Sequence, residues 1–116
     1  MENSTPLQAI RAFRQIGDRL GTSGQPTPAQ LPLIRDAGFR AVINLALPTS
    51  DNAIPEEGSL VTRLGLAYVH LPVDFSSPTP HDFRAFTQIM DAFADRPVFV
   101  HCAANLRVSA FIFSTA

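Results

Sequence analysis

Three residues that could act on a phosphorylated or otherwise anionic substrate lie within eight positions of one another near the end of this chain. Cys102 follows the apolar run Val98–Val100, which is bounded by Pro97 and is typical of a buried strand. If a helix begins at Val108, the loop from Cys102 to Arg107 points its backbone N–H groups at one spot, at the positive end of the helix dipole. Such a loop binds an oxyanion and lowers the pKa of a thiol. The pattern therefore predicts a nucleophile at the base of an anion site.

The side chains of this segment add to the predicted anion site. Arg107 has a planar fork of donors that can hold two phosphoryl oxygens at once, and Ser109 can donate to the thiolate or to a leaving sulfur. In a purely structural alternative, Cys102 is a small buried hydrophobic residue and Arg107 is a solvated charge at a helix start. The predicted substrate-binding residues are Ala103, Ala104, Asn105, Leu106, Arg107, Val108 and Ser109.

This segment resembles the phosphate-binding loop of cysteine-dependent protein phosphatases, in which His-Cys is followed by a short loop, an Arg and a Ser before a helix. The resemblance is to the bacterial tyrosine and dual-specificity phosphatase-like proteins related to the beta-lactamase-hydrolase-like phosphatase domain. It covers roughly residues 15–113 and implies a single phosphatase-like domain over residues 1–116. The further segments that carry it are Thr22–Pro26, Ala41–Pro48 and Tyr68–Asp74.

The resemblance implies a role for each matching residue in phosphomonoester hydrolysis through a phosphocysteine intermediate. Cys102 would be the nucleophile, Arg107 would stabilise the phosphoryl oxygens, and His101 would be a supporting residue that orients the loop and helps to hold the thiolate. The substrate would be a phosphorylated protein or small molecule. Neither a metal nor another cofactor is expected, because the His and Cys residues lack the paired short spacings of a metal site.

A phosphatase of this kind also needs a general acid that protonates the leaving oxygen. Asp74 is the candidate, because it lies in a Pro-flanked, Ser-rich loop over residues 72–80 that is similar to the Pro-x-Asp loop of the dual-specificity group. An Asp in such a loop can equally cap a turn. Asp82 and His81 are weaker rivals, because Thr79 and Pro80 before them are typical of a helix start.

The spacing between Cys102 and Arg107 departs from the family pattern, because four residues separate them where most cysteine phosphatases have five. Ser109 keeps the usual distance from Cys102, and Asn105 replaces a Gly, a mild change because Asn tolerates left-handed backbone. Some members of this bacterial group and the rhodanese-type sulfurtransferases use the shorter spacing. Two alternatives therefore stay open: sulfur transfer through a persulfide on Cys102, and an inactive phosphate-binding protein.

Composition predicts a single small domain of a cytoplasmic protein. The chain has 116 residues and 46% hydrophobic residues, enough for a real core. Its nine basic residues are all Arg and are scattered along the chain, which argues against a nucleic-acid partner. A single Cys excludes an internal disulfide and fits a reducing compartment. We see no leader pattern and no apolar run near the ~20 residues of a membrane helix, so no membrane partner is expected.

Alternating helices and strands predict an α/β fold with a central, mostly parallel sheet flanked by helices. The loops that follow Leu45, Leu71 and His101 are expected to gather at the carboxyl ends of the strands, where open sheets bind ligands. The capping pattern at Thr27 starts one helix, and Thr79 starts another whose apolar stripe faces the core. We expect helices over residues 5–13, 27–38, 56–64 and 80–94, and strands over 19–22, 39–45, 67–71 and 98–100.

The end of the chain is still apolar at Phe111, Ile112 and Phe113, whereas relatives of this kind continue with further helices. The last helices are therefore expected to be missing. About three apolar side chains, at ~1.5–3 kcal/mol each, would then lack a partner. C-terminal truncation, a frameshift or a homodimer would each account for this pattern, and reduced stability of the monomer is expected.

Overall fold

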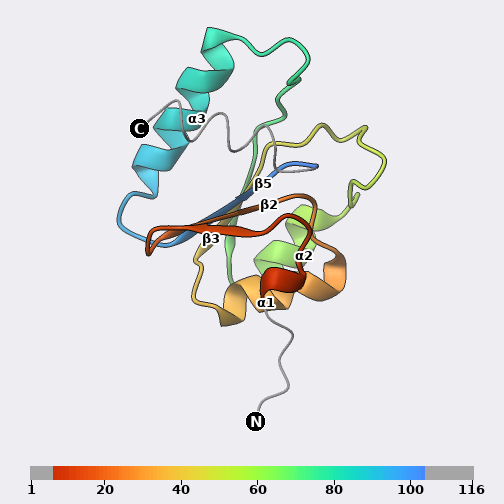
Figure 1. Cartoon of the computed structure of the whole chain (residues 1–116), viewed down its shortest axis with the longest axis vertical. Coiled ribbons are helices and arrows are strands. Elements are labelled where there is room, and N and C mark those ends of the chain that lie inside the picture. Colours follow the sequence, from red (N-terminus) through yellow and green to blue (C-terminus); the bar gives the residue numbers. More distant parts are fainter. Residues whose placement is uncertain (1–6, 104–116) are drawn as a thin grey trace.

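The computed structural model describes residues 7–103, and within them five strands form one sheet in the order β1-β2-β5-β3-β4 (Figure 1). Helices lie on both faces of this sheet, as the sequence predicts for an α/β fold. The strands are β1 (Arg14–Ile16), β2 (Leu20–Ser23), β3 (Ala41–Asn44), β4 (Ala67–His70) and β5 (Val98–His101). The helices are α1 (Leu31–Asp36), α2 (Glu57–Arg63) and α3 (Pro80–Ala92), with short 3-10 turns at η1 (Leu7–Ala9) and η2 (Pro28–Gln30).

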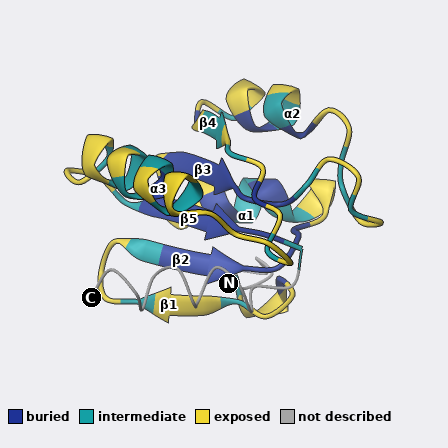
Figure 2. Ribbon diagram, turned by 90° about the horizontal axis from the view of Figure 1, so that it is seen from above, coloured by how far each residue is buried: buried dark blue, intermediate teal, exposed yellow. Residues whose placement is uncertain are grey.

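Four of the five strands run parallel, which confirms the predicted mostly parallel sheet. β5 pairs in parallel with both β2 and β3, so it occupies the centre of the sheet, and β4 extends the parallel part beyond β3. The carboxyl ends of these four strands therefore lie along one edge. In Figure 2 the central strands are mostly buried, whereas β1, which forms one edge of the sheet, is largely exposed.

The amino-terminal part of the prediction was wrong. A helix was expected over residues 5–13, but the described part holds only the 3-10 turn η1, followed by the strand β1, which pairs antiparallel with β2. The physical reason lies in the backbone: Ala12 adopts a φ of 55°, which stops a right-handed helix, and Gly17 with a φ of 66° turns the chain back into β2.

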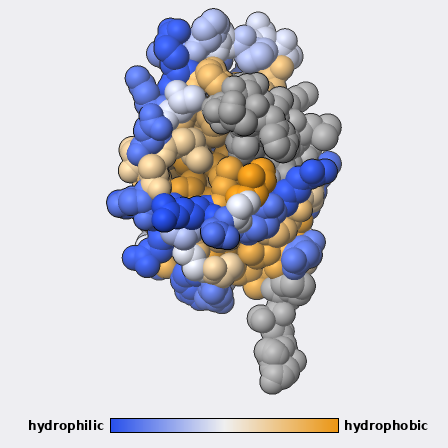
Figure 3. All heavy atoms as spheres, turned by 60° about the vertical axis from the view of Figure 1, so that its left-hand side comes forward, coloured by the Kyte–Doolittle hydropathy of each residue, from blue (hydrophilic) through white to orange (hydrophobic). Residues whose placement is uncertain are grey.

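The core has two halves, one on each face of the sheet. Because side chains alternate along a strand, Val98 and Val100 of β5 face α3 while Phe99 faces α1 and α2. Phe86 is the fully buried anchor of α3 on the first face, and Ile34 of α1 and Val61 of α2 fill the second. Further apolar side chains on the α3 face are only partly buried, and Figure 3 shows apolar surface in a hollow bordered by polar side chains.

The sequence correctly predicts where α3 begins. Thr79 Oγ1 accepts a hydrogen bond from the backbone N–H of Asp82 at 3.1 Å, and Asp82 Oδ2 accepts from the N–H of Thr79 at 3.0 Å. Pro80 occupies the first helical position, where its missing N–H costs nothing. This reciprocal cap fixes the exit of the loop that follows β4.

Among the described residues, no helix is long and apolar enough to span a bilayer.

Candidate active site

A small cavity of about 90 Å³ lies at the carboxyl edge of the sheet, where the loops after β3, β4 and β5 meet. The sequence predicts this meeting of loops, because parallel strands end at the same edge. Each of the three loops contributes to the walls of the cavity. The lining residues are Ala46, Leu47 and Ser50 after β3; Val73, Asp74, Phe75 and Ser76 after β4; and Cys102 and Ala103 after β5.

Cys102 is the first residue after the central strand β5 and is almost fully buried. Its backbone N–H donates to the carbonyl oxygen of Ser23 at the end of β2, at 3.3 Å. Its side chain belongs to the apolar cluster on the α3 face. The thiol thus lies where the core meets the small cavity. Two fixed neighbours, β2 and the core, hold the predicted nucleophile in place.

Asp74 lies in the exposed loop after β4 and lines the same cavity as Cys102. Its Oδ1 accepts from the backbone N–H of Ser76 at 3.0 Å and from the Ser76 hydroxyl at 2.6 Å. The carboxylate therefore caps a turn, which was one of the two roles expected from the sequence. Asp74 also lines the cavity of Cys102, which the other role, that of a general acid, requires. Its role as a general acid stays a prediction.

Of the predicted substrate-binding residues, the structure describes only Ala103. The carbonyl oxygen of Ala103 accepts from the backbone N–H of Gln25 at 3.1 Å and from Asn52 Nδ2 at 3.4 Å, so this end of the loop is tied to two other loops. The other predicted substrate-binding residues lie outside the described residues: Ala104, Asn105, Leu106, Arg107, Val108 and Ser109.

His101, the predicted supporting residue, is completely buried at the end of β5. Its Nε2 lies 2.6 Å from Oε2 of Glu57, the first residue of α2, and its Nδ1 lies 3.2 Å from the carbonyl oxygen of Cys102. Glu57 is also buried, and its Oε1 accepts from Gln25 Nε2 at 2.9 Å. A buried contact between Glu57 and His101 therefore lies directly behind the backbone of Cys102.

The surroundings of Glu57 favour its charged form. Burial by itself would raise the pKa of this carboxyl, but the hydrogen bond and the charge of His101, together with the hydrogen bond from Gln25, outweigh it and lower the pKa. Neither Glu57 nor Gln25 is predicted as a site residue from the sequence. Glu57 falls in the helix expected over residues 56–64 and Gln25 in the segment Thr22–Pro26, and no local spacing connects either of them to His101.

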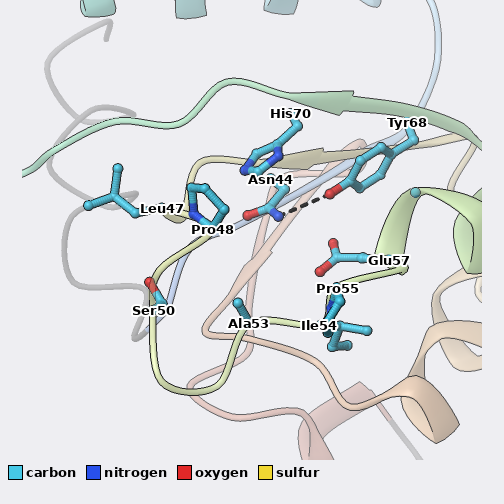
Figure 4. A pocket seen from close by; sticks show the side chains of 11 residues that line it. Asn44, Leu47, Pro48, Ser50, Ala53, Ile54, Pro55, Glu57, Tyr68 and His70 are labelled. Atoms are coloured by element: carbon cyan, nitrogen blue, oxygen red, sulfur yellow. Dashed lines mark hydrogen bonds between the residues drawn. The ribbon is translucent and has the colours of Figure 1, made fainter.

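A second pocket, of about 410 Å³, lies on the other side of the loop after β3 (Figure 4). It shares Leu47 and Ser50 with the small cavity. Asn44 Nδ2 donates to the Tyr68 hydroxyl at 3.0 Å, and Glu57 lines the same wall. Burial is the main cause that raises the pKa of Tyr68 to about 12, with the Glu57 carboxylate adding to it and the Asn44 hydrogen bond opposing it. Tyr68 is therefore neutral at physiological pH.

One protein family and several curated relatives match most of the chain. Residues 15–114 match the family described as DSP-PTPase phosphatase fused to NAD+ kinase. The chain is 35% identical over 104 residues to a beta-lactamase hydrolase-like protein of Agrobacterium fabrum, a match that covers 87% of this chain and 23% of that protein. A protein of the same description from Xylella fastidiosa (strain Temecula1) is 34% identical over 95 residues, covering 79% and 22%. The chain thus spans less than a quarter of the length of these relatives.

Solved structures share the fold. A DUF442 protein of Shewanella putrefaciens CN-32, solved as a candidate phosphatase, superposes with a TM-score of 0.88 at 45% identity and covers 92% of this chain and 68% of its own. The core catalytic domain of the PP-IP phosphatase SIW14 from S. cerevisiae has a TM-score of 0.75 at 14% identity, covering 95% and 65%. At that identity the second likeness extends to the fold alone.

Proposed function

We propose that this chain, which belongs to the family described as DSP-PTPase phosphatase fused to NAD+ kinase, hydrolyses phosphomonoesters through a phosphocysteine intermediate. The family and the shared phosphatase fold make a phosphatase the starting point. The observation that carries the mechanism is that Cys102 and Asp74, which come from different strands, line one small cavity. A nucleophile and a carboxyl group in one cavity are the two groups that such a reaction needs.

In the proposed reaction the Cys102 thiolate attacks phosphorus and forms the S–P bond as the P–O bond to the leaving group breaks. Asp74, in its protonated form, gives its proton to the leaving oxygen. The backbone amides that follow Cys102, together with Arg107, stabilise the negative charge on the phosphoryl oxygens. Water then attacks phosphorus and gives a proton to the Asp74 carboxylate, which restores the acid. The S–P bond breaks and releases inorganic phosphate and the thiolate.

The proposed substrate is a phosphorylated protein or small molecule. The small size of the cavity between Asp74 and Cys102 suits a phosphoryl group, with the rest of the substrate outside it. One solved structure of the same fold, P. aeruginosa TpbA, was obtained in complex with phosphotyrosine, but at 17% identity it is a guide to the fold alone. A cytoplasmic location and a homodimer accompany this proposal as predictions from the sequence.

One sequence feature favours a second candidate, sulfur transfer through a persulfide on Cys102. The four residues between Cys102 and Arg107 match the spacing of rhodanese-type sulfurtransferases. A sulfurtransferase needs no acid for a leaving oxygen, so the position of Asp74 favours the phosphatase. An inactive phosphate-binding protein is the third candidate and would keep only the anion site.

The test compares the wild type with Cys102→Ser in two assays: hydrolysis of a small aryl phosphate, and sulfur transfer from thiosulfate to cyanide. The proposal expects phosphate release from the wild type and its loss in Cys102→Ser, because a serine hydroxyl is a far weaker nucleophile than a thiolate. Sulfur transfer without phosphate release would establish the second candidate. A folded protein that is silent in both assays but binds inorganic phosphate would be the third.

A further inference from the structure

We propose that Glu57 is a positioning residue of the active site. Glu57 holds His101 in its doubly protonated form, and His101 in turn orients the peptide group between Cys102 and Ala103, the first of the anion-binding loop. The inference rests on the proposed function only in taking Cys102 as the nucleophile. It arises from a buried pair of polar side chains in contact, since the exposed fraction of His101 is 0% and that of Glu57 is 2%.

The positions of the partners show which parts of the fold this pair connects. Glu57 is the first residue of α2, His101 is the last residue of β5, and Gln25 follows β2. The contacts run in series from Gln25 Nε2 to Glu57 Oε1 at 2.9 Å and from Glu57 Oε2 to His101 Nε2 at 2.6 Å. The second contact has the short length of a charge-assisted hydrogen bond. Three elements are thus joined immediately behind Cys102.

The two neighbours of the His101 ring decide its protonation. Nε2 faces the Glu57 carboxylate and Nδ1 faces the Cys102 carbonyl oxygen, and both of these groups only accept hydrogen bonds. A ring that donates to both carries a proton on each nitrogen and a positive charge. Glu57 supplies the matching negative charge, without which a buried imidazolium would be costly.

The contact from His101 to the Cys102 carbonyl oxygen orients the next peptide group. In a planar trans peptide the N–H of one residue points away from the carbonyl oxygen of the residue before it. The Cys102 carbonyl points to the His101 ring, so the Ala103 N–H points away from that ring. The Cys102 side chain also lies away from His101, in the cluster on the α3 face. The amide and the positive ring behind it both favour a negative charge on the thiol.

The polar groups around Glu57 account for its charge. Besides His101, it faces the neutral amide of Gln25 and, on β4, Tyr68 and His70, which line the larger pocket with it. Tyr68 is neutral at physiological pH, and the charge of His70 acts in the same direction as that of His101. The strongest contacts of Glu57 are therefore those with His101 and Gln25.

The test follows the alkylation of Cys102 by iodoacetamide between about pH 5 and pH 10, a reaction that requires the thiolate and no phosphatase turnover. Cys102 is the only cysteine of the chain, so the modification reports on one site. Glu57→Gln keeps the shape of the side chain and removes the charge. Glu56→Gln is the matched control, because Glu56 is exposed and lies one position away. Gln25→Leu is a second variant that removes a partner of Glu57 without touching His101.

We expect Glu57→Gln to slow alkylation about tenfold near pH 6 and to converge with the wild type near pH 10, where thiols in general are ionised. Gln25→Leu should slow alkylation near pH 6 by about two- to threefold. If Glu57→Gln does not fold, this variant tests the role of Glu57 in its place, and an unchanged profile would overturn the inference. Glu56→Gln should superimpose on the wild type. A Glu57→Gln profile identical to that of the wild type would overturn the inference, and so would a loss of rate that is equal at every pH, which indicates altered packing.

This experiment separates the inference from the proposed function. If the wild type does not hydrolyse aryl phosphates but Glu57→Gln shifts the alkylation profile, the phosphatase proposal fails and the positioning role stands. If the wild type hydrolyses them in a Cys102-dependent manner and the alkylation profiles coincide, the function stands and the positioning role is wrong.

Discussion

Asp74 makes two kinds of contact, although its side chain belongs to an exposed residue. It caps a turn through Ser76, and it lines the cavity that holds Cys102. The two contacts are compatible, because a short turn fixes the direction of the side chain while leaving it at the mouth of the cavity. A general acid gains from such restraint, since proton transfer requires a fixed approach to the leaving oxygen.

Asp74→Asn tests this role at the level of a single residue. Under the phosphatase proposal we expect the turnover number for an aryl phosphate to fall about 10²- to 10³-fold, because the leaving group must depart without a proton. Sulfur transfer or phosphate binding should be nearly unchanged. Asp91→Asn, at an exposed position of α3, is the control. An Asp74→Asn enzyme with unchanged turnover would remove Asp74 from the mechanism.

At the scale of the elements, the start of α3 holds one end of the loop that carries Asp74. The reciprocal hydrogen bonds between Thr79 and Asp82 fix the point where the loop enters the helix, and Phe86 anchors the helix to the sheet. Asp82, a rival candidate for the acid, is committed to this cap. The helix thus provides one fixed end of the loop, and β4 provides the other.

Thr79→Ala removes the side-chain half of this cap. We expect the free energy of unfolding to fall by about 1 kcal/mol, the usual cost of losing an N-cap hydroxyl, as measured by urea denaturation. Ser77→Ala, an exposed hydroxyl of the same loop, is the control and should change stability by less than about 0.5 kcal/mol. Equal effects of the two substitutions would show that the cap is not what stabilises the start of α3.

Gly21→Ala tests the packing of β2 against the centre of the sheet. A Cβ at this position would lie 2.8 Å from Cζ of Phe39 and 2.9 Å from Cδ2 of Phe99, closer than carbon atoms pack. We expect a loss of about 1–3 kcal/mol in unfolding free energy, because the two rings must move. Gly17→Asn is the matched control, since nothing lies within 4 Å of a Cβ there and Asn tolerates its positive φ of 66°. A stability like that of the wild type would mean that the rings rearrange without cost.

At the scale of the whole molecule, the Glu57–His101 pair connects α2 to β5 in the interior of the protein. Its members come from α2 and β5 and lie 44 residues apart in the sequence. A buried pair of this kind contributes little when it is compared with apolar residues of the same size, but breaking one half of it is costly, because the other charge stays buried. Stability should therefore depend on pH through Glu57.

The sign of this dependence follows from the lowered pKa of Glu57. A carboxyl whose pKa is lower in the folded than in the unfolded protein stabilises the fold above its unfolded value, near 4.5, and this contribution is lost as the pH falls through the folded value. We expect the urea midpoint of the wild type to fall more steeply below about pH 4.5 than that of Glu57→Gln. Parallel midpoint curves would show that Glu57 does not carry this dependence, and Glu56→Gln again provides the control.

Most of the fold could be predicted from the sequence, and so could the meeting of the loops that carry Asp74 and Cys102. Apolar runs indicated β3, β4 and β5, and an apolar stripe at helical spacing indicated α3. The rule that parallel strands end at one edge then predicted that the two loops meet. Such features are local or follow from general topology, so periodicity and capping residues are enough to predict them.

The partners of His101 and the course of residues 7–23 could not be predicted from the sequence, because they depend on tertiary packing. The contact between Glu57 and His101 depends on how α2 packs beside β5, and the antiparallel pairing of β1 depends on a positive φ at Ala12 and a turn at Gly17. Long-range packing of this kind leaves no periodic signal in either segment, because each partner meets its ordinary local requirements as a helix start, a strand end or a turn.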